Sequence, residues 1–403
     1  MPDDVQIIRS LAARYAELAA DPIQDERRLL WRRHNSLKGD RIPIYLRRMA
    51  FQEMPQSRCL CRDEFYRGHE WGLRKEIYRA GLGDDYILEP WWTVRAVHES
   101  TAPGLWGLPF SRDYHPDDTH SFTWDPPIKD EEDIERIVPP RHRIDEAATQ
   151  RRRDRLQEAM GEVLPVVVDR GPVCGRINVL LGNLRGMEQL MLDMVERPDW
   201  LHRLMGILRD GVLGAHEEAE AAGDWKLLNH HNQSIPYAQE LADPAPGRTA
   251  KRSELWGYFE AQELTGVSPR MFDEFMVQYQ MPIMREFGLT AYGCCEDLTD
   301  KIDVLRPIPN LRRIAVTPAA DAPACAEQIG DEYVVSYRPN PADMVGYGWD
   351  PDRVRRILRR DLDACRANGC HVDVCLKDTE TVQGDPERVP LWVQTVREVA
   401  ETL

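Results

Sequence analysis

From residue 163 onward, short apolar runs alternate with longer amphipathic stretches along the chain. The apolar runs are nearly continuous in hydrophobicity, as is typical of parallel strands covered on both faces, and the longer stretches have the 3.6-residue period of helices. The predicted strands are VLPVVVD (163–169), WKLLNHHN (225–232), LTAYGCCE (289–296), RRIAVTP (312–318), YVVSYRP (333–339) and HVDVCLKD (371–378). The predicted helices cover 187–195, 200–222, 255–264, 269–287, 322–329, 351–368 and 386–403. This alternation predicts an α/β fold built on a parallel sheet.

The first 160 residues are less regular. Two early strands are predicted over 42–46 and 86–97, and helices over 4–19, 25–35 and 144–160. Two early and six later strands make the eight of a (β/α)8 TIM barrel. A doubly wound open sheet is the alternative, but the chain contains neither a GxGxxG fingerprint nor a P-loop motif.

We expect a single barrel domain over 1–403 with two additions. Residues 1–40 form an N-terminal helical extension, and 100–160 form an insertion over the barrel mouth. The part near 100–140 is a long inserted loop, rich in Pro, Asp, His and aromatic residues and with little periodicity.

Composition narrows the function classes. The 403 residues include 52 Lys and Arg against 68 Asp and Glu, a formal net charge of −16, and 42% are hydrophobic. This balance is typical of a soluble globular protein, and the acidic charge opposes binding to nucleic acid or to an anionic membrane. No apolar run is long enough to span a bilayer, and the start lacks the layout of a secretory signal. We therefore expect a cytoplasmic protein.

Nine cysteines are an odd number, which argues against a complete disulfide set. Cys294 and Cys295 stand at a predicted strand end and are followed by Glu296. Thiolates, imidazoles and carboxylates are the ligands of Zn²⁺, so these three residues are candidate metal ligands together with His230. The alternative is that one cysteine packs in the core and the other caps a loop. Cys174, Cys325 and Cys365 are interpreted as core residues.

Other polar side chains also fall at predicted strand ends, where a barrel carries its chemistry. His231 and Asp378 are candidate proton acceptors, and Lys377 either pairs with Asp378 or takes part in catalysis. The candidate substrate-binding residues are Arg48, Trp92, Asn229, Asn232 and Arg338. For Arg47 a surface salt bridge is the favoured interpretation, and the tryptophans either line a pocket or bury the long loop.

Several segments together resemble the uroporphyrinogen decarboxylase-like superfamily, specifically a branch related to zinc-dependent corrinoid methyltransferases. They are RIPIYLRRMAFQEMP, GPVCGRINVLLG, SPRMFDEFMVQYQMPIMREFGLTAYGCCEDL, IPNLRRIAVTPAADAPACAEQIGDEYVVSYRPNPA and LKDTETV. The resemblance covers most of the chain and is best from about residue 160 to the end. It implies a (β/α)8 barrel whose site lies at the C-terminal mouth, and homodimers are common in such proteins.

The superfamily holds two chemistries. Decarboxylases of tetrapyrroles use no metal and open with a signature close to PVWxMRQAGRYxPEY, of which IPIYLRRMAFQEMPQ keeps an Arg but not the Gly-Arg-Tyr part. The methyltransferases bind zinc through a His-x-Cys and a later Cys. Tyr292-Gly293-Cys294 stands at the position of the His-x-Cys, and it matches the Cys but not the His. Cys295 or Glu296 is the candidate replacement for the missing His. Cys375 lies near the position of the later Cys.

The resemblance thus implies a zinc-dependent, methyltransferase-like enzyme that moves a methyl group between a small substrate, or a thiol or tetrahydrofolate, and a corrinoid protein. The corrinoid would be carried by a separate partner, since the chain has no DxHxxG-type motif. A metal-free carboxy-lyase acting on a carboxylated substrate is the alternative, and a non-catalytic binding barrel is a third.

Overall fold

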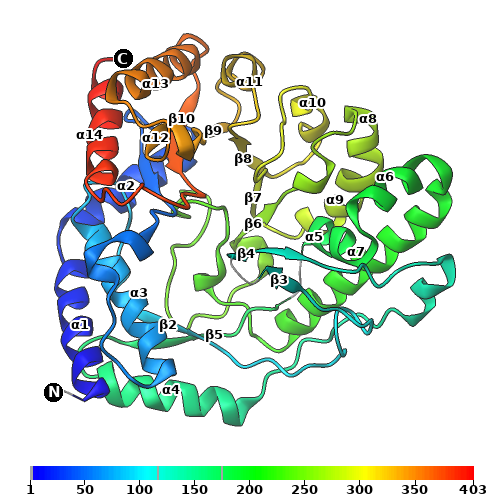
Figure 1. Ribbon diagram of the computed structural model, residues 1–403, viewed down its shortest axis with the longest axis horizontal. Coiled ribbons are helices and arrows are strands. Elements are labelled where there is room, and N and C mark those ends of the chain that lie inside the picture. Colours follow the sequence, from blue (N-terminus) through cyan, green and yellow to red (C-terminus); the bar gives the residue numbers. More distant parts are fainter. Residues whose placement is uncertain (1–2, 116–117, 174–175) are drawn as a thin grey trace.

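The computed structural model describes residues 3–115, 118–173 and 176–403, and it contains the predicted parallel α/β architecture. Eight parallel strands are formed in these residues: β1 (Ile44–Leu46), β2 (Trp92–Arg95), β5 (Val166–Asp169), β6 (Trp256–Phe259), β7 (Leu289–Tyr292), β8 (Leu311–Val316), β9 (Val334–Tyr337) and β10 (His371–Leu376). Six of them form one curled sheet in the order β1-β10-β9-β8-β7-β6, and β2 and β5 form a separate pair. The strands β6 to β10 lie along one arc in Figure 1, with β2 and β5 below them.

The predicted closed barrel is wrong for the described residues, because strand pairing stops at two places. The first is between β1 and β2. The amides of Ile44 and Leu46 in β1 donate to the carboxylates of Asp85 (2.8 Å) and Asp84 (3.0 Å). Side chains thus satisfy the backbone groups that a neighbouring strand would otherwise pair with.

The second interruption lies between β5 and β6, where the predicted strand 225–232 is wrong. Its residues form a short 3₁₀ helix (Leu227–Asn229) and an irregular turn. Asn229 donates to Asp169 at the end of β5 (2.6 Å), and Nδ1 of His230 accepts from the amide of Trp256 in β6 (3.2 Å). A single backbone hydrogen bond, from the amide of His231 to the carbonyl of Trp256 (3.2 Å), accompanies these side-chain links.

The number of parallel strands is nevertheless eight, because a strand forms where the sequence predicts a helix over 255–264, and this prediction is therefore also wrong. Its first residues are the buried strand β6, and a 3₁₀ helix (Gln262–Leu264) follows. A run of four apolar residues does not distinguish a buried strand from a helical segment by periodicity.

Helices cover the outside of the sheet. They are α1 (Asp4–Ala19), α2 (Ile23–Asn35), α3 (Glu64–Ala80), α4 (Glu146–Met160), α5 (Ile177–Arg185), α6 (Met187–Glu196), α7 (Pro198–Ala221), α8 (Pro269–Phe272), α9 (Gln278–Met284), α10 (Ile302–Leu305), α11 (Ala322–Ile329), α12 (Pro341–Met344), α13 (Pro351–Ala367) and α14 (Arg388–Glu401). The helices predicted over 4–19 and 25–35 are confirmed as α1 and α2, and that over 144–160 as α4. Within the described ranges, no helix is both long and apolar enough to cross a membrane.

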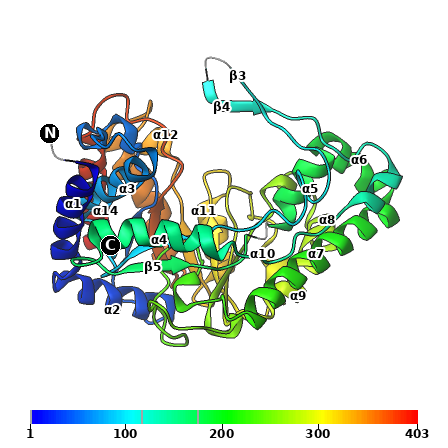
Figure 2. The same cartoon turned by 90° about the horizontal axis from the view of Figure 1, so that it is seen from below.

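The segment predicted as a long loop includes a small antiparallel hairpin of β3 (Asp113–His115) and β4 (Asp118–Thr123). Figure 2 shows this hairpin projecting from the body of the molecule. The remainder of the segment packs on the body: Trp106 and Ile134 belong to the main hydrophobic core.

Candidate functional site

Cys294 and Cys295 lie directly after β7, at the carboxyl end of the sheet, with their sulfurs 3.7 Å apart. The preceding Gly293 has a φ of +105°, and a Cβ built there would lie 2.8 Å from the Cβ of Ala315. Only glycine adopts this conformation without strain in so little space. The turn that carries the two thiols therefore depends on this residue.

Glu296, predicted to be a metal ligand, instead holds the thiol turn in place. Its buried carboxylate accepts hydrogen bonds from the amides of Cys294 (2.7 Å), Cys295 (3.0 Å) and Ala261 (2.8 Å). Both oxygens are occupied by backbone donors.

Arg338, predicted to bind substrate, also stabilises this turn. Its guanidinium is buried and donates to the carbonyls of Gly293 (3.1 Å) and Cys294 (2.9 Å). Arg338 therefore acts inside the protein, as a positioning residue for the thiols.

Lys377, which follows β10, brings a positive charge to both sulfurs. Its Nζ lies 3.3 Å from the sulfur of Cys294, 3.4 Å from that of Cys295 and 3.0 Å from the carboxylate of Asp378. Burial and the charge of Arg338 lower the pKa of Lys377, but Cys294, Asp378 and Cys295 raise it, and the net effect is a raised pKa. The predicted neighbours Lys377 and Asp378 are thus brought together with the predicted cysteines.

The two thiols differ in acidity. The pKa of Cys295 is lowered to about 7 by a hydrogen bond from Cys294 and by the charge of Lys377, although burial acts in the opposite direction. The same hydrogen bond and burial raise the pKa of Cys294 to about 12. At neutral pH the pair therefore holds a thiol beside a half-populated thiolate, and the thiolate is the nucleophilic form of cysteine.

Glu260 is a site residue that the sequence analysis missed. It follows β6, its side chain is buried, and a carboxyl oxygen contacts the guanidinium of Arg176. Burial, and next the neighbouring Cys294, raise the pKa of Glu260 to about 8, so the carboxyl group is protonated at neutral pH. The sequence carries one signal for Glu260, which is an acid directly after the apolar run WGYF, but the pattern there predicts a helix instead of a strand.

A cavity of about 530 Å³ occupies the gap between β5 and β6, and neither Cys294 nor Cys295 is among the described residues that line it. Gln233 lines it and links it to the thiol pair, because the side-chain amide nitrogen of Gln233 lies 3.9 Å from the sulfur of Cys294. The aromatic walls are Trp225, Trp256, Tyr258, Phe259 and Phe287, and the cationic residues of the lining are Arg47, Arg95 and Arg176. The cavity therefore combines an apolar body with positive charge.

The three arginines are not equivalent. Arg95 forms an ion pair with Asp169, and the guanidinium of Arg176 contacts the carboxyl group of Glu260. The guanidinium of Arg47 has no hydrogen bond or ion pair to any described residue, although it lines the cavity. The interpretation of Arg47 as part of a surface salt bridge is therefore wrong, while Arg48 points outward to Glu380 (2.9 Å).

The predicted histidine pair lines the cavity. The ring of His231 lies 4.8 Å from that of Tyr258, and burial among protein atoms, then Arg47 and Arg176, lowers its pKa to about 4. Burial likewise lowers the pKa of His230 to about 4, and its Nδ1 is used by the amide of Trp256. Both imidazoles are therefore neutral at pH 7.

The remaining predicted residues have other surroundings. Asn229 lines the cavity with its amide bound to Asp169. Asn232 is buried in a local turn, where it donates to the carbonyl of Ile235 (3.2 Å). Trp92 is not a cavity residue: its indole donates to His69 (3.0 Å) and packs on Tyr15, on the other side of β2.

The metal site expected from Cys294, Cys295, Glu296 and His230 is incomplete in the described part of the chain. No three His, Cys, Asp or Glu side chains there are arranged to hold a metal ion. The two sulfurs are spaced like the edge of a zinc tetrahedron with bonds of about 2.3 Å, which is about 3.8 Å long. Both oxygens of Glu296 and Nδ1 of His230, however, accept from backbone amides, and Cys375 is fully buried in β10. Cys174 lies outside the described residues.

The comparisons with known proteins concern the fold. No protein-family model matches the chain, and no curated protein matches it. Among solved structures, a methyltransferase from Methanosarcina mazei is similar, with a TM-score of 0.52 over 92% of this chain and 97% of that chain, at 13% sequence identity. At this identity the likeness shows a shared α/β architecture.

Proposed function

We propose that the chain is a methyltransferase whose reaction takes place at the Cys294–Cys295 thiol pair. The observation that carries the proposal is a cysteine with a pKa of about 7 next to a buried ammonium, and Gln233 joins its partner Cys294 to a substrate-sized cavity. The fold shared with a methyltransferase supports the same reaction class.

The thiolate of Cys295 serves as the nucleophile. Its sulfur lone pair attacks the methyl carbon of the donor, and the bond from that carbon to the leaving atom breaks. The leaving atom keeps the bonding electrons and takes a proton, for which Glu260 is the protonated acid beside the pair. Lys377 favours the thiolate before attack and again when the methyl group passes to an acceptor and the thiolate is restored.

The acceptor is proposed to be a corrinoid carried by a separate protein that docks at the cavity. The resemblance stated above supports this choice, since the chain itself has no corrinoid motif.

The substrate is proposed to be a small anion with an apolar body. Arg47 offers an unpaired guanidinium, which suits a carboxylate, and the aromatic walls suit the body. The neutral His231 beside Arg47 provides a hydrogen-bonding group that does not compete for the anion.

Zinc at the thiol pair remains a proposal supported only by the sulfur spacing, and no step above uses a metal. Elemental analysis of protein purified without chelator tests it. Less than a tenth of an equivalent of zinc would refute it, and a full equivalent lost in Cys294→Ser would support it.

The methyl-transfer proposal is tested by incubating the protein with candidate methyl donors and locating methylated peptides by mass spectrometry. We expect a methyl group on Cys295 that is absent in Cys295→Ser. Cys59→Ser is the matched control, since Cys59 is a partly accessible thiol held elsewhere, near Ser57. Turnover that survives Cys295→Ser but not Arg47→Met would instead favour the carboxy-lyase alternative.

A further inference from the structure

The cavity between β5 and β6 has a charged end and an apolar end. Its arginines and its aspartate lie at the carboxyl side of the sheet, where strands end and α5 begins: Arg47, Arg95, Asp169 and Arg176. The opposite part of the lining belongs to α7 and α9: Val212, His216, Gln280 and Ile283. Since α9 packs on both α7 and β6, the cavity runs from the carboxyl ends of the strands, its outer end, to the layer between β6 and these helices, its inner end.

The cavity reaches its inner end around the free edge of β6. This strand is the last of its sheet, and all four of its residues, Trp256–Phe259, line the cavity. Successive side chains of a strand point to opposite faces. Tyr258 shares a cluster with Ala291 of β7, whereas Phe259 belongs with Phe287 to the main hydrophobic core. A cavity that is lined by both kinds of residue extends to both faces of the strand.

Three aromatic rings form the wall of the inner end. The ring of Phe287 lies 5.8 Å from that of Trp225 and 6.0 Å from that of Phe259. Phe287 fits against β6 because Gly257 has no side chain, and a Cβ there would lie 2.6 Å from the ring. The three aromatic residues keep 7 or 8% of their surface accessible, whereas Leu255, just before β6, has none. The wall is therefore not covered on all sides by protein atoms.

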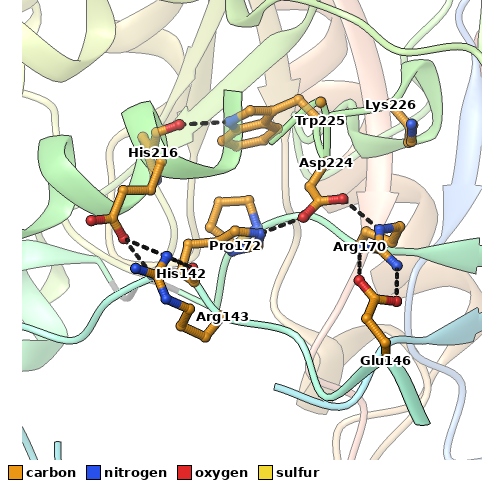
Figure 3. Close-up of polar contacts among 12 residues, drawn as sticks. His142, Arg143, Glu146, Arg170, Pro172, His216, Asp224, Trp225 and Lys226 are labelled. Carbon is orange, nitrogen blue, oxygen red and sulfur yellow. Dashed lines mark hydrogen bonds and ion pairs between the residues drawn. The ribbon is translucent and has the colours of Figure 1, made fainter. Parts of the chain in front are cut away.

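Trp225 is fixed in this wall by contacts of its side chain and of its neighbour. Its indole donates to the carbonyl of His216 in α7 (3.1 Å), as Figure 3 shows. The preceding residue, Asp224, pairs with Arg170 and lies 2.8 Å from Nε2 of His142. The inner end is thus preformed.

The inner end carries no charge in its described lining. Burial, and next the charge of Arg252, lower the pKa of His216 to about 3, so this imidazole is neutral at pH 7. The side-chain amide of Gln280 is used within the protein, since it donates to the carbonyl of Glu260 (2.7 Å) and accepts from the hydroxyl of Tyr292 (2.8 Å). An apolar group is therefore the matching occupant of the inner end, because a buried ion would lack a partner there.

The outer end has an excess of positive charge. Asp169 offsets the charge of Arg95, with which it forms an ion pair. Glu260, which contacts Arg176, has a pKa of about 8 and is protonated at neutral pH, so it leaves the charge of Arg176 in place. Arg47 has no partner among the described residues. Arg47 and Arg176 are thus both able to attract an anion.

We infer that the substrate is a straight-chain carboxylate whose headgroup binds at the outer end and whose apolar tail passes the edge of β6 into the inner end. This inference rests on the proposed function and names the class of its substrate. Arg47 and Arg176 bind the carboxylate, and Trp225, Phe259 and Phe287 enclose the tail. Because the thiol turn lies at the carboxyl side of the sheet, the methyl group to be transferred lies near the headgroup, and the tail serves for recognition.

Titration calorimetry on the wild-type protein, without a methyl donor, tests this inference. The probes are butyrate, hexanoate and octanoate, with octanol as a chain that has no charge. We expect binding to become roughly threefold tighter with each added methylene group, and octanol to bind at least about tenfold more weakly than octanoate. An affinity that does not depend on chain length, equal affinities for octanol and octanoate, or no heat with millimolar octanoate would overturn the inference.

Two substitutions on α7 locate the tail. Val212→Phe fills the inner end, and Leu213→Phe is the matched control, because the next residue of the helix is not among the described residues that line the cavity. We expect Val212→Phe to reduce the octanoate affinity to that of butyrate and to leave butyrate binding unchanged, while Leu213→Phe behaves like the wild type. Unchanged octanoate binding in Val212→Phe would refute the placement of the tail. Thermal unfolding shows whether each variant folds, and if Val212→Phe does not, the chain-length series on the wild type decides.

Failure of this inference is distinguishable from failure of the methyl-transfer proposal. Cys295→Ser should bind the carboxylates like the wild type, because binding does not need the thiolate. Length-dependent binding without methylation of Cys295 would refute the methyl-transfer proposal and support the binding site. Methylation of Cys295 without any dependence of binding on chain length would refute the inference alone.

Discussion

Replacing Lys377 by Met tests the electrostatic basis of the thiolate. The ammonium lies 3.4 Å from the sulfur of Cys295, and two unit charges at that distance interact with about 1.2 kcal/mol in water-like screening and about 5 kcal/mol near a protein surface. Because Cys295 is exposed, the smaller figure applies, and it corresponds to a pKa change of roughly one. We therefore expect the pKa of Cys295 to rise from about 7 to roughly 8.

The assay is the rate of alkylation of Cys295 by iodoacetamide as a function of pH, followed by peptide mass spectrometry. The rate rises with the thiolate fraction, so at pH 7 it should fall from about half of its maximum to about a tenth. Lys377→Arg keeps the charge and should retain most of the rate.

Asp378→Asn provides a control of the opposite sign. The negative charge of Asp378 raises the pKa of Cys295, so its removal should shift the alkylation curve to lower pH. Asparagine also tolerates the positive φ of this residue (+57°). A Cys295 pKa that is unchanged in Lys377→Met, or that moves in the same direction in both variants, would refute the electrostatic account.

Three further substitutions test other parts of the site. Glu260→Gln should stabilise the protein near pH 8. The carboxyl group has a pKa of about 8 in the folded protein and near 4.5 in the unfolded chain, so the free energy of unfolding of the wild type falls as the pH rises between these values. Allowing for the lost contact with Arg176, the variant should gain on the order of 2 kcal/mol in urea unfolding. A flat response between pH 5 and 8 in the wild type would contradict this. Glu296→Gln replaces one acceptor oxygen by a donor that faces backbone amides, so we expect a loss of roughly 2–4 kcal/mol in the free energy of unfolding and faster alkylation of both thiols. Arg47→Met should raise KM for an anionic substrate about tenfold with little change in kcat, and Arg48→Met, which alters an exposed pair with Glu380, should not.

The sequence predicts the parallel strands and the polar residues at their carboxyl ends well, because both depend on local patterns. The thiol pair, Lys377 and Asp378 lie together, as expected for strand ends that meet at one edge of a sheet. The periodicity of apolar residues in the sequence does not reveal which neighbouring groups a polar side chain contacts in the fold. Glu296 is a residue type that binds metals, and Arg338 is one that binds anionic substrates. The backbone of the thiol turn, however, needs a hydrogen-bond acceptor for its amides and a donor for its carbonyls, and Glu296 and Arg338 supply these.

The two errors in strand assignment have a common cause, which also explains the main cavity. The segment 225–232 has the apolar and polar composition of a strand, yet Asn229 and His230 use their side chains to bind β5 and the edge of β6. A strand in this position would bridge β5 and β6 and occupy the space between them, although the interruption between β1 and β2 would remain. Because the chain turns away instead, an open volume remains, and it is lined by the residues of β6 from Trp256 to Phe259 together with His231 and Gln233 of the same turn. The interruption between β5 and β6 thus leaves a cavity of about 530 Å³, which Gln233 links to Cys294, and a design that restored strand pairing here would remove the proposed substrate site while leaving the thiol turn intact.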